Sequence, residues 1–168
     1  MIIISDTSII SGLILVGRIS LLTELFDEII VPHAVQEELL KLENYETDVK
    51  QFIKSNQVQI MELSRMVFYA ELLKILDKGE AQAITLAIEL KADLLLIDEK
   101  KGRFIAEQLE LKITGLLGLL LLAKQRGFID NVKQVMDDLV HKSGFWIGEK
   151  LYRTVLRKAD EWSIMDII

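Results

Sequence analysis

The chain is organised around short, uninterrupted apolar runs, which are separated by longer segments with helical periodicity. Short runs rich in Ile, Leu and Val are typical of strands buried on both faces, and such strands occur in parallel sheets that helices cover on both sides. The alternation of the two patterns therefore predicts an α/β fold with a mostly parallel sheet of about four or five strands. The predicted strands are residues 2–5, 28–31, 57–61, 93–97 and 112–114.

Helical periodicity fills the segments between these runs, where apolar residues recur three and four positions apart. The predicted helices are 8–16, 19–26, 32–42, 46–54, 65–76, 80–90 and 102–109, with Pro32 in a first helical turn that tolerates it. Beyond residue 115 the pattern is helical throughout, with breaks at Gly127 and at Ser143–Gly144. A chain of 168 residues fits one domain. We expect an α/β core over 1–115 and a helical extension over 116–168.

Composition excludes several classes of protein. Cysteine is absent, which excludes disulfides, cysteine-ligated metals and thiol catalysis, and the only histidines are His33 and His141. A net charge of −6 argues against a protein that coats nucleic acid non-specifically. The N-terminal MIIISDTSII lacks the basic region of a signal peptide, and the most apolar stretch, 113–123, has about half the length that spans a bilayer. We expect a soluble, cytoplasmic protein without a membrane segment.

Two aspartates follow the two most apolar runs: Asp6 comes after IIIS and Asp98 after LLLI. The carboxyl ends of parallel strands meet at one edge of a sheet, and functional sites gather there. A buried carboxylate is costly unless it is paired or bound to a cation. Either aspartate alone could simply cap the next helix, but two in equivalent positions favour a shared site.

Two glutamates are further candidates. Glu38 lies beside the buried face of its helix, whereas its neighbour Glu37 is expected to face solvent. Glu80 begins a helix, where a negative charge could simply favour the helix dipole. If these side chains converge with the two aspartates, their like charges require a counter-charge. Mg²⁺ or Mn²⁺ prefers such oxygen ligands, and one or two ions can activate water for phosphodiester cleavage.

Five motifs, in this order and spacing, resemble the PIN-domain family: DTS (6–8), VPHAVQEEL (31–39), GEAQAI (79–84), LLLIDEKKGR (94–103) and ITGLLGLL (113–120). More closely, the chain is similar to the toxin-type (VapC-like) branch of bacterial and archaeal PIN proteins, in a subgroup with a helical C-terminal extension. The resemblance covers nearly the whole chain. It implies a PIN-like three-layer α/β/α sandwich and a Mg²⁺- or Mn²⁺-dependent ribonuclease, a hydrolase. In the toxin branch it also implies a homodimer and a small antitoxin partner.

The resemblance assigns residues as well. The acids that match its catalytic and metal-binding positions are Asp6, Glu38, Glu80 and Asp98, with Glu99 as a further candidate ligand. Ser8 and Thr114 match positions whose side chains could hold these acids in place without binding the metal themselves. Two departures stand out: position 80 is more often Asp in simple toxins, and the segment beyond residue 115 is longer here.

Basic and aromatic residues suggest where RNA would lie. Lys100, Lys101 and Arg103 follow Asp98 and could hold the phosphate backbone, or they could be a solvated helix start. The aromatic residues Phe145, Trp146 and Tyr152 lie near several basic residues and could stack on bases. Core or dimer contacts are the favoured interpretation of these aromatics. The apolar end of ADEWSIMDII (159–168) suggests a contact with a second subunit or partner.

The leading hypothesis is a metal-dependent endoribonuclease that acts as the toxin of a toxin–antitoxin pair. The alternative is a catalytically weak or inactive module that keeps the fold and binds RNA or a protein partner. An aspartate-nucleophile phosphatase is disfavoured, because it would need a second Asp where the chain has Ser8. A dinucleotide-binding domain is also disfavoured, because no G-x-G-x-x-G follows the first strand.

Overall fold

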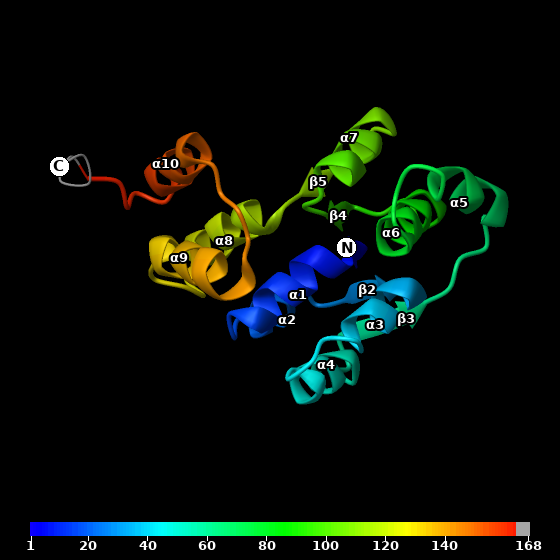
Figure 1. Cartoon of the computed structure of the whole chain (residues 1–168), viewed down its shortest axis with the longest axis horizontal. Coiled ribbons are helices and arrows are strands. Elements are labelled where there is room, and N and C mark those ends of the chain that lie inside the picture. The colour runs from blue at the N-terminus through cyan, green and yellow to red at the C-terminus, as the bar shows by residue number, and fades with distance from the viewer. Residues whose placement is uncertain (164–168) are drawn as a thin grey trace.

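The computed structural model describes residues 1–163 and contains one parallel sheet flanked by helices (Figure 1). The sheet has five strands in the order β3-β2-β1-β4-β5, and every neighbouring pair is parallel. The strands are β1 Ile3–Ser5, β2 Ile29–Pro32, β3 Val58–Met61, β4 Leu94–Leu96 and β5 Ile113–Thr114. The predicted parallel α/β sheet is therefore confirmed.

The helices are α1 Thr7–Leu15, α2 Ser20–Leu25, α3 His33–Leu39, α4 Glu46–Ile53, α5 Met66–Leu72, α6 Lys78–Glu89, α7 Lys100–Gln108, α8 Leu116–Gln125, α9 Val132–Ser143 and α10 Glu149–Lys158. Most bounds lie within two or three residues of those predicted. Pro32 is an exception, because it ends β2 in extended geometry and caps α3 from outside the helix. The helix predicted over 65–76 ends at Leu72, and residues 73–76 form turns before the extended Asp77, which caps α6.

Each face of the sheet has its own apolar core. Ile3, Val31 and Leu96 pack on one face, in a cluster that includes residues of α1, α2, α8 and α9. The alternate strand residues Ile4 and Leu95 pack on the other face, in a cluster with α5, α6 and α7. Burial of the central strands on both faces explains why their sequences are continuously apolar rather than alternating. The result is the predicted three-layer α/β/α sandwich.

The strand order creates a switch point between β1 and β4. From β1 the chain builds outward through β2 and β3, and then returns to place β4 on the other side of β1. Helices leave such a pair of strands in different directions, so a crevice opens at their carboxyl ends, and open α/β sheets bind ligands there. Asp6 and Asp98 follow these two strands, and the Asp6 amide donates a hydrogen bond of 3.0 Å to the Leu96 carbonyl.

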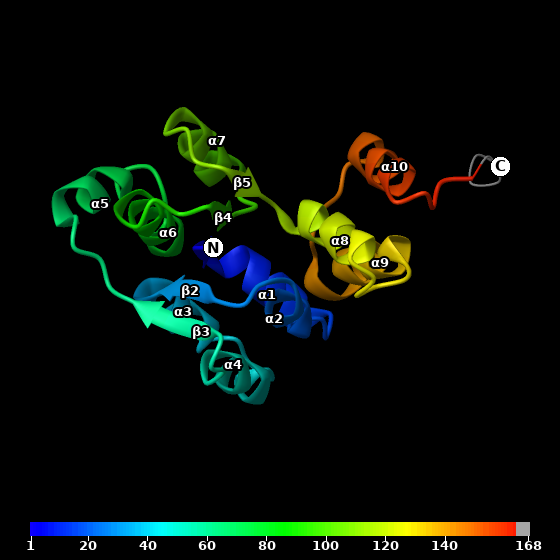
Figure 2. The same cartoon turned by 180° about the vertical axis from the view of Figure 1, so that it is seen from behind.

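The C-terminal helices share the core of the first face. Leu120 of α8, Met136 of α9 and Leu156 of α10 belong to the same buried cluster as Ile10 of α1. Figures 1 and 2 show α8, α9 and α10 gathered at one end of the molecule, away from α5 and α6. The predicted breaks are confirmed, because Gly127 and Gly144 adopt left-handed backbone with φ of 78° and 69°.

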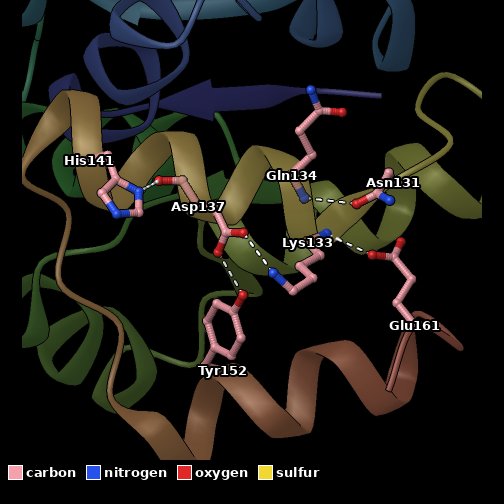
Figure 3. A network of polar contacts seen from close by, with 7 residues as sticks. All are labelled: Asn131, Lys133, Gln134, Asp137, His141, Tyr152 and Glu161. Atoms are coloured by element: carbon pink, nitrogen blue, oxygen red, sulfur yellow. Dashed lines mark hydrogen bonds and ion pairs between the residues drawn. The ribbon is translucent and has the colours of Figure 1, made fainter. Parts of the chain in front are cut away.

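Polar contacts fasten α10 to α9 (Figure 3). Asp137 accepts hydrogen bonds from Tyr152 Oη at 2.6 Å and from Lys133 Nζ at 2.8 Å. Beyond α10, the Glu161 carboxylate accepts bonds from the main-chain amides of Val132 and Lys133 at 2.6 and 2.7 Å. Glu161 therefore caps the start of α9 from a distant part of the chain, which joins the segment after α10 to the N-terminal end of α9.

Two expectations from the sequence concern the apolar stretch 113–123 and the apolar C-terminal end. Among the helices of the described chain, none is long and apolar enough to cross a membrane, and the apolar stretch 113–123 forms β5 and most of α8. The apolar end expected to make a partner contact includes residues 164–168, which lie outside the described residues.

Candidate active site

Asp6 is buried directly after the carboxyl end of β1. Its side chain is 1 % exposed and caps α1 by accepting a hydrogen bond of 3.3 Å from the Ile9 amide. Ser8 Oγ donates to both carboxylate oxygens, at 2.8 and 3.0 Å, as expected for a residue that supports Asp6. Burial raises the pKa of Asp6 to about 8, although the bonds from Ser8 and Ile9 oppose that rise. Asp6 thus both caps the helix and is a strongly perturbed acid in a functional position.

Asp98 follows β4, and its side chain lies beside Gly115 and Leu116, which follow the neighbouring strand β5. The Leu116 amide at the start of α8 donates to Asp98 Oδ2 at 3.0 Å. A Cβ on Gly115 would lie 2.3 Å from Asp98 Oδ1, so only glycine admits this carboxylate. Burial raises the pKa of Asp98, and the Leu116 amide and the Arg103 guanidinium partly counter this effect. Arg103 Nη1 is itself held by the Ile97 carbonyl at 3.1 Å.

Glu80 lies in the first turn of α6 and is 7 % exposed. It forms a capping box with Asp77, whose carboxylate accepts from the Glu80 amide at 2.8 Å. Glu80 Oε1 is buried and has no hydrogen-bond partner among the residues described, although the nearby Gly102 backbone lowers the pKa. Burial and the charges of Asp77 and Glu99 outweigh that effect and raise the pKa of Glu80. A buried carboxylate oxygen without a hydrogen-bond donor is unfavourable, and a cation bound beside it would stabilise it.

Glu38, in the last turn of α3, connects this helix to the starts of α1 and α6. It projects from α3, which contacts both α1 and α6. Thr7 Oγ1 donates to Glu38 Oε2, and the Gly79 amide donates to Glu38 Oε1 at 3.1 Å. Thr7 follows Asp6 and Gly79 precedes Glu80, so Glu38 stands beside both acids along the chain. Glu37 faces solvent as predicted, with 57 % of its side chain exposed.

These acids interact electrostatically at one edge of the sheet. The charges of Asp98 and Glu80 both raise the pKa of Asp6, so the three carboxylates lie close enough to repel one another. Their oxygen donors, the unpartnered Oε1 and the uncompensated charge fit a hard divalent cation. Within residues 1–163, however, no three Asp, Glu or His side chains are already assembled as a metal site. A bound ion would have to draw carboxylates away from partners such as Thr7 and Leu116.

The remaining predicted residues divide into two groups. Lys100, Arg103 and Thr114 line a groove of about 600 Å³ that Asp98 also lines. We call this cavity, which Trp146 and Lys158 border as well, the Asp98 groove. Lys101 is not part of it, because it lines a separate pocket with Lys74 and Phe104. Glu99 is exposed at the cap of α7, and its charge raises the pKa of Asp98 and of Glu80.

Sequence reasoning missed several residues of this site. Asp77 is one of them, although its spacing to Glu80 is that of a capping box and could have indicated this contact. The bond from Thr7 to Glu38 and the glycine contacts at 102 and 115 depend on how separate helices meet, and no local pattern indicates them. His33 is half exposed and lies 4.0 Å from Glu37 rather than near Asp6, Glu80 or Asp98.

Comparison with known proteins adds one finding. A family model described as DUF3368: PIN domain matches residues 2–161, which is nearly the whole chain. No curated protein matches the chain.

Proposed function

The chain belongs to the PIN-domain family DUF3368, and from this premise we propose that it is a Mg²⁺- or Mn²⁺-dependent endoribonuclease. PIN domains are generally nucleases and usually use divalent metal ions, which supports hydrolysis of phosphodiester bonds. The observation that carries the proposal is the juxtaposition of Asp6 and Asp98 at the β1/β4 switch point, beside an unpartnered oxygen of Glu80. This arrangement offers oxygen ligands where open α/β sheets bind their ligands.

Four carboxylates would hold one or two ions in this proposal: Asp6, Glu38, Glu80 and Asp98, with Glu99 near enough to assist. A bound divalent ion supplies a water of lowered pKa and stabilises charge on the phosphate. Ser8 would keep the Asp6 carboxylate oriented through its two hydrogen bonds. The Leu116 amide and Gly115 would position Asp98 in the same way.

The cations beside Asp98 have a different role in the proposal. Arg103 is fixed to the Ile97 carbonyl, so it would balance the charge of Asp98 rather than follow a mobile substrate. Lys100 is exposed in the Asp98 groove and would contact a substrate phosphate.

The resemblance of the five motifs extends the proposal to biological role. It favours the toxin of a toxin–antitoxin pair, acting as a homodimer and restrained by a small antitoxin protein. We also keep the division into an α/β nuclease core over 1–115 and a helical extension over 116–168.

A second candidate function is a catalytically weak or inactive module that binds RNA or a protein partner. One observation favours it: among the described side chains, the acids contact protein donors and do not form an assembled metal site.

RNA cleavage separates the two candidates. The wild-type protein is incubated with single-stranded RNA in Mn²⁺ or in EDTA, beside Asp6→Asn and Glu37→Gln. Glu37→Gln is the matched control, because it removes an exposed charge from the helix that carries Glu38. The proposal predicts cleavage in Mn²⁺ by the wild type and by Glu37→Gln, and none in EDTA or by Asp6→Asn. Absence of cleavage by a folded wild-type protein would favour the inactive module.

A further inference from the structure

The loop between α9 and α10, residues 144–148, lies beside the acidic site although it is far from it in sequence. Phe145 and Trp146 line the Asp98 groove. They also line a second cavity of about 400 Å³, together with Ser8, Asp98 and Glu99. The C-terminal extension therefore contributes aromatic side chains to the surroundings of the predicted catalytic acids.

Glycines at both ends shape this loop. Gly144 ends α9 in left-handed geometry, with φ of 69°, and the Phe145 amide turns back to the Leu139 carbonyl at 3.2 Å. At the other end, a Cβ on Gly148 would lie 3.1 Å from the Trp146 ring. The indole thus lies against glycine backbone, where a larger residue would push on the ring.

The aromatics of the extension differ in their surroundings, which corrects part of the interpretation from sequence. Phe145 and Tyr152 pack against the core, as favoured. Trp146 is 85 % exposed, so it is not a core residue. An exposed indole offers a flat apolar face, and nucleic-acid bases stack on such faces without regard to sequence.

Unpaired cations accompany Trp146 in the Asp98 groove. Lys100 comes from α7 and Lys158 from α10, and neither forms an ion pair with any of residues 1–163. The chain as a whole carries a net charge of −6, so these lysines form a local exception at the edge of the acidic site. Cations that track a groove, next to an aromatic platform, are the combination that binds single-stranded nucleic acid.

We propose that the Asp98 groove binds single-stranded RNA, with one base stacked on Trp146 and the flanking phosphates held by Lys100 and Lys158. An unpaired base is required, because a base within a duplex does not offer its face to an indole. The purpose of this placement, bringing a phosphate to Asp98, rests on the proposed nuclease function. The binding itself does not, since its parts lie outside the four carboxylates.

Binding is measured on the full chain by fluorescence anisotropy of a labelled single-stranded oligoribonucleotide, in EDTA so that no cleavage occurs. Trp146→Ala is expected to weaken binding about 5- to 150-fold, the loss typical of one stacked base. Trp146→Phe should retain part of the affinity, because phenyl rings also stack. Phe104→Ala removes an exposed aromatic that lines a different pocket, and it should leave the affinity unchanged.

Salt dependence tests the lysines. Lys100→Ala and Lys158→Ala should each reduce the slope of log affinity against log salt by about 0.7, as expected for one phosphate contact on a single strand. Lys101→Ala, on the same helix as Lys100 but in another pocket, should change the slope less.

Two results would overturn the proposal. The first is unchanged RNA affinity in Trp146→Ala, and a simultaneous change in oligomeric state or in the capture of a protein partner would then assign Trp146 to a protein contact. The second is equal affinity for duplex and single-stranded RNA. Trp146-dependent binding without any cleavage in Mn²⁺ would support the groove and contradict the nuclease. Cleavage in Mn²⁺ with an unchanged RNA affinity of Trp146→Ala would support the nuclease and contradict the groove.

Discussion

Substitution of Asp6 by Asn should stabilise the metal-free protein, and the gain should grow with pH. The Asp6 carboxyl is almost fully buried, and burial raises its pKa from an ordinary value of 3.8 to about 8. The unfolded chain therefore ionises Asp6 at a lower pH than the folded chain does. Between these two pKa values the folded state keeps a proton that the unfolded state releases, so stability falls as pH rises.

The magnitude follows from the two pKa values. A folded pKa of about 8 against 3.8 costs the folded state about 2 kcal/mol at pH 5 and about 5 kcal/mol at pH 7.5. Asn carries no ionisable proton and retains an oxygen that can accept from Ser8 and Ile9. Its new amide group could lack a partner, but that cost does not depend on pH. The stability of Asp6→Asn relative to the wild type should thus increase by about 3 kcal/mol from pH 5 to pH 7.5.

Urea denaturation followed by circular dichroism, in EDTA at pH 5 and pH 7.5, measures this difference. Glu37→Gln is the control, and because Glu37 is exposed it should change stability by less than about 0.5 kcal/mol. In Mn²⁺ the order should reverse, since an ion bound only by the folded wild type adds to its stability. A difference that stays constant or shrinks with rising pH would mean that Asp6 is not held protonated in the folded chain.

Further substitutions test the elements around the site. Gly115→Ala should displace Asp98, because the new Cβ would lie 2.3 Å from Oδ1, and RNA cleavage should fall while far-ultraviolet circular dichroism is retained. Asp77→Ala removes the cap of α6 and should cost about 1 kcal/mol in urea denaturation, whereas Asp77→Asn should cost less. Glu161→Gln weakens the contact with Lys124 and the start of α9, and should cost about 1–3 kcal/mol at pH 7. Burial opposes ionisation of Glu161, but Lys124 and the amides of α9 hold its pKa below the usual range, so this loss should shrink as pH falls through that pKa.

The sequence predicted the sheet because the cause of its pattern is local. Strands buried on both faces are apolar at nearly every position, which makes runs such as Leu94–Leu96 recognisable. The position of Asp6 and Asp98 at one edge then follows from parallel pairing, whatever the exact helix bounds. The glutamates were predicted to be near this edge for a weaker reason, since Glu80 also fits the local role of a helix cap.

Features that depend on how elements rotate against one another were not predictable. Lys100 and Lys101 are adjacent in sequence, yet the orientation of α7 on the sheet sends them to different cavities. Likewise, nothing local distinguishes Phe145, which packs on the core, from Trp146, which does not. The difference depends on how the loop between α9 and α10 lies against the fold, because both aromatics line the Asp98 groove but only Trp146 is left exposed.

In the proposed site, acids that follow separate strands and lie on separate helices form one centre for a divalent ion. Electron paramagnetic resonance of free Mn²⁺ during titration with protein tests it directly, because bound Mn²⁺ loses its free-ion signal. We expect that the wild type and Glu37→Gln take up Mn²⁺, and that Asp6→Asn and Asp98→Asn bind it at least tenfold more weakly. Equal uptake of Mn²⁺ by all four folded proteins, or uptake by none, would contradict the claim.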